Sequence, residues 1–133
     1  AAAVANGHAL LPARPEVPIR LVDPDLAADP EAIRRLDAFL VQERSGRLRQ
    51  VVYLNCRAAM FEKALLGADL DVGILAAVIR HELEHLRGAG EAEARRAEKA
   101  FFQRLVFNGQ VPIGEGLRHL ADLEQDRQLR ESR

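Results

Sequence analysis

Residues 71–91 read DVGILAAVIRHELEHLRGAGE, and the expected fold is built outward from this stretch. Apolar residues recur at spacings of three and four through its first half, which predicts an amphipathic helix over about 72–87. Asp71 is the expected N-cap, and Gly88 and Gly90 are the expected helix end. Such a helix presents one apolar face to a core.

The helix contains an H-E-x-x-H pattern at residues 81–85. Histidines four positions apart lie on one helical face, so the imidazoles of His81 and His85 can share one metal ion. Neutral imidazole nitrogen is a good ligand for zinc. Glu82 is turned about 100° from His81, which places its carboxylate beside the ion as a general base rather than as a ligand.

A helical wheel places these three titratable side chains on the arc that should face the core. Glu82 falls at the centre of an apolar stripe, and His81 and His85 continue the stripe beside it, whereas Glu84 falls on the polar face. Burying such groups without partners costs several kcal/mol each. A metal ion would satisfy all three; in the alternative, core carbonyls bond the imidazoles and an arginine pairs with Glu82.

The third metal ligand is expected on the next helix, over about 91–107. Glu91 comes first after the glycine turn, lies on the apolar arc of that helix and is the expected ligand. Glu93 falls among charged residues and is expected to face solvent. Glu98 has two interpretations: it orients a ligand imidazole as a second carboxylate, or it pairs with Arg95.

The motif at 81–85, followed by Glu91, resembles the zincin metallopeptidases, specifically the gluzincins, whose third zinc ligand is a glutamate on the helix after the motif helix. The run EAEARRA at 91–97 resembles the E-x-E-A-D-x-x-A segment of membrane-associated and regulatory gluzincins, with Arg95 in place of the aspartate. The resemblance covers about residues 48–107. It implies an α+β zincin-like fold that is mostly helical, with a short β-sheet, an active-site helix and a glutamate helix.

The resemblance also implies a function. It indicates a zinc metallopeptidase that binds one Zn²⁺ per chain and hydrolyses peptide bonds of a peptide or protein substrate, with Glu82 as general base toward a metal-activated water. Such enzymes use a histidine or tyrosine to stabilise the oxyanion, and His119 and Tyr53 are the candidates. Two alternatives stay open: a catalytically idle or latent zinc-binding module that acts through protein–protein interaction, and a plain helical interaction domain.

Two strands are expected before the motif helix. Alternating apolar residues over 17–22 predict a short edge strand, the only kind that tolerates Pro18. Residues 51–55 are β-branched and aromatic and predict a second strand. By resemblance this second strand corresponds to the zincin edge strand that pairs with extended substrate; in the alternative it is an ordinary core strand.

The rest of the chain is expected to be helical or irregular. Asp29 and Pro30 predict a helix start, and Ser45–Gly46 predicts the end of that helix. The remaining expectations are a helix over 57–66 closed by Gly67, a helix after Pro112 that contains His119, an irregular arm over 1–16, and a charged, frayed tail over 122–133.

Length and composition set the class of protein. With 133 residues and a net charge of −1, a single domain over 1–133 is expected, and the near-neutral charge argues against nucleic acid as a partner. Cys56 is the only cysteine, which excludes an internal disulfide. No apolar run approaches the roughly 20 residues of a membrane span. The protein is expected to be soluble, either cytoplasmic or exported after signal removal; the sequence does not fix its oligomeric state.

Overall fold

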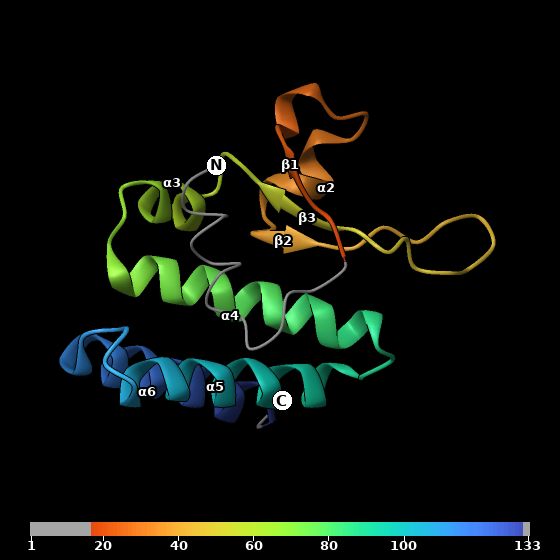
Figure 1. Cartoon of the computed structure of the whole chain (residues 1–133). Helices are drawn as coiled ribbons and strands as arrows, with labels where there is room; N and C mark the ends of the chain where they lie inside the picture. Colours follow the sequence, from red (N-terminus) through yellow and green to blue (C-terminus); the bar gives the residue numbers. More distant parts are fainter. Residues whose placement is uncertain (1–16, 132–133) are drawn as a thin grey trace.

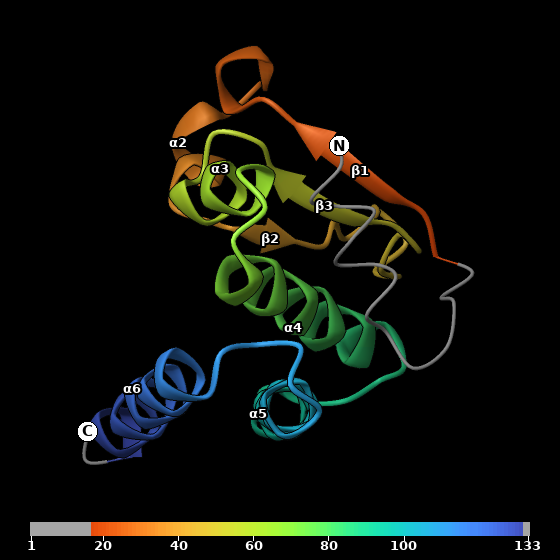
Figure 2. The ribbon, with the colours of Figure 1, turned by 60° about the vertical axis from the view of Figure 1, so that its left-hand side comes forward.

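The structure is a computed structural model that describes residues 17–131. It is an α+β fold of three layers, in which α4 lies between a small sheet with α3 on one side and α5 with α6 on the other (Figures 1 and 2). The expected irregular arm over 1–16 lies outside the described residues. The elements are β1 (Ile19–Val22), η1 (Pro24–Leu26), α2 (Pro30–Arg34), β2 (Ala38–Phe39), β3 (Val52–Asn55), α3 (Ala59–Leu65), α4 (Asp69–Leu86), α5 (Glu91–Phe107) and α6 (Ile113–Glu131).

The sheet has the order β1-β3-β2, with β1 parallel and β2 antiparallel to β3. The edge position expected for the first strand is therefore confirmed. The interpretation of residues 51–55 as an edge strand that receives substrate is wrong, because β3 is paired on both sides. Its side chains explain this position: Val52 and Leu54 are fully buried in the core, as a central strand requires.

The prediction of a helix from Pro30 to Ser45 is correct only for the first turn. Asp29 does cap it, with its carboxylate accepting from the Ala32 amide at 3.4 Å, but α2 ends at Arg34. The Asn55 side chain donates to the carbonyls of Ile33 and Arg34 at the end of α2, and to that of Leu36 beyond it at 3.0 Å. These hydrogen bonds replace the ones that a longer helix would make within itself. The chain then forms β2 and a hairpin that projects from the molecule (Figure 1).

The two long helices around the motif form where expected. α5 spans Glu91–Phe107 as predicted, whereas α4 begins at Asp69, so Asp71 lies in its first turn and is not its cap. Ala68 occupies the N-cap position without a side-chain hydrogen bond, and both aspartates act favourably on the helix dipole instead. Gly88 has a φ of +98°, the left-handed conformation that ends α4 and turns the chain toward α5.

The tail expected to be frayed over 122–133 continues α6 as far as Glu131. The first half of α6 packs closely on α5, because Gly116 lets the helix approach Val106 and because Leu120 is buried. Its second half is joined to α5 by an ion pair of 2.9 Å between Lys99 Nζ and Glu124 Oε2. Among the helices over residues 17–131, none is long and apolar enough to cross a membrane.

Candidate metal centre

Three side chains from the end of α4 and the start of α5 converge at one point. His81 and His85 lie one turn apart on α4, and the turn at Gly88 brings Glu91, the first residue of α5, back against them. One ligand atom from each residue lies within 4.8 Å of the others. The structure therefore brings together the three residues predicted as metal ligands.

The separations of these ligand atoms fit a small dication. His81 Nε2 lies 3.2 Å from His85 Nε2 and 2.9 Å from Glu91 Oε1, and His85 Nε2 lies 3.1 Å from Glu91 Oε2. Tetrahedral zinc with bonds of 2.0–2.1 Å needs ligand atoms about 3.3 Å apart. Two imidazole nitrogens and a carboxylate are also a donor set that zinc prefers.

Both imidazoles are held through their other nitrogen. His81 Nδ1 donates to Glu98 Oε1 at 2.7 Å, and His85 Nδ1 donates to the Ala89 carbonyl at 3.0 Å. A protonated Nδ1 leaves the lone pair of a neutral imidazole on Nε2, which is the atom that faces the cluster. Of the two partners considered for Glu98, the structure shows the His81 imidazole, and no ion pair joins Glu98 to Arg95 among residues 17–131.

Arg95 contacts Glu91 rather than Glu98. Its Nε lies 3.3 Å from Glu91 Oε1, the same oxygen that faces His81. The charges of His81, Arg95 and His85 outweigh the effect of burial and lower the pKa of Glu91. For His81 the hydrogen bond to Glu98 outweighs burial and raises the pKa of the imidazole. Both shifts have the direction expected of opposite charges held close together in the metal-free cluster.

Glu82 lies beside the two imidazoles, half-buried, as the helical wheel predicts. Burial raises the pKa of its carboxyl, and the charges of His81 and His85 oppose this shift. Within residues 17–131 no hydrogen bond or ion pair engages its carboxylate, so the arginine partner of the alternative interpretation is not found. Glu84, expected to face solvent, is half-buried and pairs with Arg80 at 2.8 Å.

No protein-family model, curated protein or solved structure matches this chain. The assignment of the site therefore rests on its own residues.

Neither candidate for oxyanion stabilisation is hydrogen-bonded to the cluster among the described residues. The Tyr53 ring stacks on Phe39 with 5.3 Å between centroids, and its hydroxyl accepts from Arg49. It points to the face of β3 opposite Val52 and Leu54, since side chains alternate along a strand. In the described part of the chain no hydrogen bond or ring contact joins it to His81, His85 or Glu91.

His119 packs against α5 from the side of α6. Its ring meets Phe102 edge-on with 4.7 Å between centroids, and burial lowers the pKa of its imidazole. No hydrogen bond or ion pair joins it to the cluster among the residues that the structure covers. Glu93 is exposed, as predicted, and Cys56 is a half-buried free thiol at the edge of the core.

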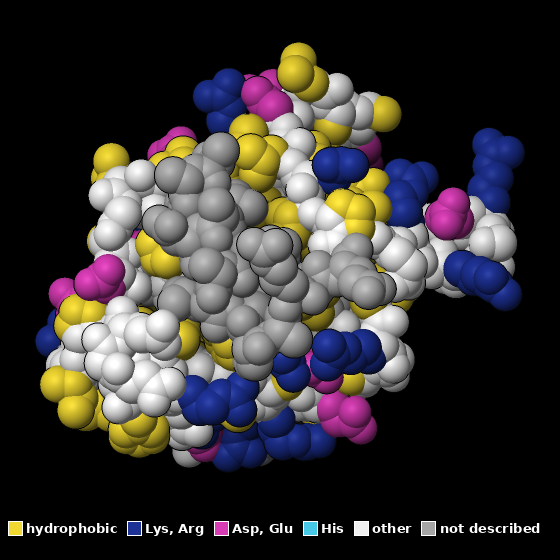
Figure 3. All heavy atoms as spheres, viewed as in Figure 1, with side chains coloured by type: hydrophobic (Ala, Val, Ile, Leu, Met, Phe, Trp, Pro, Cys, Tyr) yellow, Lys and Arg dark blue, Asp and Glu magenta, His cyan; other side chains and the backbone are white. Residues whose placement is uncertain are grey.

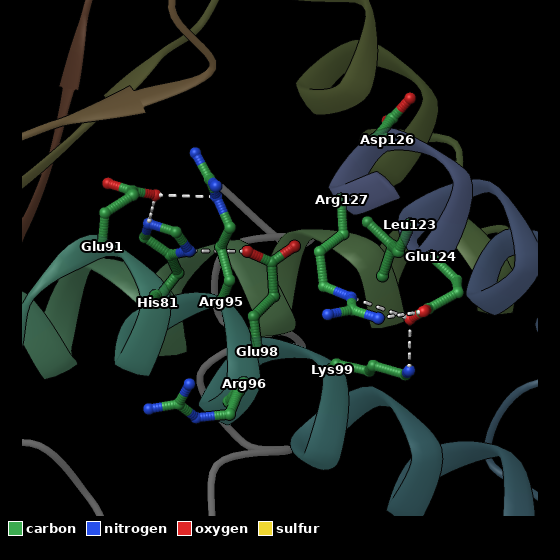
Figure 4. Close-up of a pocket in the computed structure, with 11 residues that line it drawn as sticks. His81, Glu91, Arg95, Arg96, Glu98, Lys99, Leu123, Glu124, Asp126 and Arg127 are labelled. Carbon is green, nitrogen blue, oxygen red and sulfur yellow. Dashed lines mark hydrogen bonds and ion pairs between the residues drawn. The ribbon is translucent and has the colours of Figure 1, made fainter. Parts of the chain in front are cut away.

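A cavity of about 780 Å³ opens beside the cluster, between the first half of α5 and the second half of α6 (Figure 4). His81 and Glu91 line one end of it, and Arg95 and Lys99 line its α5 side. Sequence reasoning did not find this cavity. The one lining residue that stood out in the sequence is Arg95, because it replaces the aspartate of the gluzincin segment.

Proposed function

We propose that this chain is a zinc-dependent metallopeptidase in which His81, His85 and Glu91 hold one Zn²⁺ and Glu82 is the general base. The observation that carries the proposal is the convergence of acceptor atoms. When both imidazoles are neutral and donate through Nδ1, their Nε2 lone pairs face each other at 3.2 Å and both face the Glu91 carboxylate. Only protons or a shared cation relieve this arrangement.

The chemistry divides between the ion and the protein. When bound, Zn²⁺ supplies Lewis acidity that lowers the pKa of a water molecule and polarises a substrate carbonyl. Glu82 accepts the proton of the attacking water and passes it to the leaving amine, a role suited to a half-buried carboxylate without a competing partner. Glu98 and the Ala89 carbonyl fix the two imidazoles, so that the ligand atoms are positioned before metal and substrate bind.

The alternative function is a zinc-binding module without turnover. One observation favours it: among the described residues no hydrogen bond or ion pair joins Tyr53 or His119 to the cluster. Both functions require zinc, whereas only the peptidase requires Glu82.

The test first measures zinc per chain by elemental analysis after dialysis against metal-free buffer, and one zinc per chain is expected. A mixture of blocked peptides is then incubated with the zinc-loaded protein, and products are identified by mass spectrometry. Glu82→Gln should keep zinc and lose cleavage by about 10²–10⁴-fold, the usual contribution of a general base. Glu84→Gln is the control on the same helix. Absence of zinc would overturn both functions, and full turnover in Glu82→Gln would overturn the catalytic assignment.

A further inference from the structure

Arg95 is the basic residue next to the proposed zinc ligands. Its Nε lies 3.3 Å from Glu91 Oε1, which itself lies 2.9 Å from His81 Nε2. The Arg95 side chain is 37% exposed and lines the cavity, and Figure 4 shows it rising between Glu91 and Glu98. No hydrogen bond engages its terminal Nη atoms anywhere in residues 17–131. A guanidinium with unused donors thus faces the cavity beside the metal centre.

The charge of the cavity also favours an anion. Its lining contains four basic residues, Arg95, Arg96, Lys99 and Arg127, and four carboxylates, among them Glu91 and Glu98. These lining charges balance in the metal-free protein, so a bound dication beside the Glu82 carboxylate leaves a surplus of one positive charge. Figure 3 shows Lys and Arg side chains along the edge of the molecule near α5, as well as on the projecting hairpin and at the opposite edge. A ligand with a negative charge would compensate the surplus.

The far end of the cavity is occupied by charges that are already paired. Glu124 of α6 bridges to Lys99 Nζ at 2.9 Å and to Arg127 (Figure 4). These hydrogen bonds lower the pKa of Glu124 to about 2, so the bridge stays ionised at neutral pH. The cationic side chain available to a ligand near the metal ligands is therefore Arg95, with Arg96 as its neighbour on α5.

We infer that this cavity binds a carboxylate of the substrate and that Arg95 recognises it. The inference rests on the proposed peptidase function and names the substrate class: peptides with a carboxylate directly after the scissile bond. A guanidinium binds carboxylate through paired N–H donors, which gives geometric specificity as well as charge. The backbone carboxyl of the residue after the scissile bond lies three bonds from the scissile carbon, a reach of about 4 Å.

Two sources can present this carboxylate, and the chemistry at Arg95 is the same for both. One is the free C-terminus of a peptide whose last residue is released. The other is an aspartate or glutamate side chain directly after the scissile bond of an internal segment. Three probes of equal length separate them: acetyl-Ala-Ala with a free C-terminus, acetyl-Ala-Ala-amide, and acetyl-Ala-Asp-amide.

Binding of these probes is measured by calorimetry on the Glu82→Gln chain, both zinc-loaded and metal-free, so that the readout does not depend on turnover. At least one carboxylate probe should bind about tenfold more tightly than the neutral amide, and which one does identifies the source. Arg95→Gln should abolish the preference, and Arg95→Lys should keep part of it because it retains the charge. Arg118→Gln, an exposed arginine of α6 outside the cavity, should leave it unchanged.

Two outcomes would overturn the inference: equal binding of all three probes, or a preference that survives in Arg95→Gln. Zinc content is measured for each variant, and the metal-free comparison decides the matter if Arg95→Gln loses zinc through its contact with Glu91. The proposed function fails separately. Cleavage of peptides without carboxylate preference would refute this inference alone, whereas carboxylate-selective binding without any cleavage would refute the peptidase alone.

Discussion

His81 Nδ1 and Glu98 Oε1 lie 2.7 Å apart, although the two residues are 17 positions apart and belong to different helices. Both side chains are largely shielded from water, with 13% and 16% of their surface exposed. A charge-assisted hydrogen bond in such a setting is shorter and stronger than one between neutral groups. It joins α4 to α5 at the point where His81, His85 and Glu91 converge, so the same contact links the two helices and orients the His81 ring.

Glu98→Ala is therefore expected to weaken zinc binding without removing a ligand. Loss of the partner that orients a ligand imidazole typically lowers metal affinity by about 10–100-fold. The measurement is a competition between the protein and a chelator of known zinc affinity. Glu93→Ala, on the exposed face of the same helix, is the matched control and should bind zinc as the wild type does. Equal affinities in the two variants would show that Glu98 does not position His81.

Zinc is expected to stabilise the folded state, in addition to its proposed role in peptide hydrolysis. The proposed ligands come from two helices that separate on unfolding, so the ion would bind the folded chain in preference to the unfolded one. At a free zinc concentration 1,000 times Kd, the folded state gains about 4 kcal/mol. The melting temperature should rise with added zinc and fall again with a chelator.

His85→Gln is the variant for this measurement, since it removes one ligand from the cluster. Its melting temperature should not respond to zinc. A wild-type melting temperature that ignores zinc, or a His85→Gln response equal to that of the wild type, would contradict ligation by these residues.

The sequence predicts the parts of the fold that depend on local pattern. The bounds of α5 and the spacing of His81, His85 and Glu91 follow from helical periodicity and from the glycine turn between the helices. Other features depend on contacts between distant segments. The end of α2 is determined by Asn55, whose side chain bonds the Leu36 carbonyl from 19 residues away, and no local pattern contains that information.

The same limit applies to the site. Whether Glu98 pairs with Arg95 or with His81 depends on how α5 rotates against α4, and the sequence leaves both options open. The continuation of α6 through the charged tail depends likewise on its ion pair with Lys99. A mixed-sign segment resembles a frayed end until the neighbour that pairs with it is known.

Gly73 is expected to be required for the packing of α4. A Cβ at this position would lie 2.6 Å from Val111 Cγ2 and 3.5 Å from Phe102 Cε2, both in the core. Gly73→Ala should therefore destabilise the protein by about 1–3 kcal/mol, the usual effect of overpacking. Chemical denaturation measures the change in the free energy of unfolding.

Two further variants show whether the effect of Gly73→Ala arises from this close approach. Gly114→Ala, a helical glycine with open space around it, should be neutral or slightly stabilising because alanine has the higher helix propensity. Adding Val111→Ala to Gly73→Ala should recover part of the loss that overpacking causes. If Gly73→Ala changes the free energy of unfolding no more than Gly114→Ala does, then α4 and Val111 do not pack as closely as the structure shows.

The bridge between α5 and α6 is expected to give the fold a specific acid sensitivity. Hydrogen bonds from Arg127 and Lys99 lower the pKa of Glu124 from 4.5 to about 2. Because the folded pKa is the lower one, the stabilisation is present above pH 4.5 and is lost as pH falls through about 2. Glu124→Gln should therefore melt at a lower temperature than wild type at pH 6, and the difference should shrink steadily as pH falls toward 2. Glu115→Gln, at the exposed start of α6, is the control. A difference between wild type and Glu124→Gln that stays constant over this range would mean that ionisation of Glu124 does not hold the two helices together.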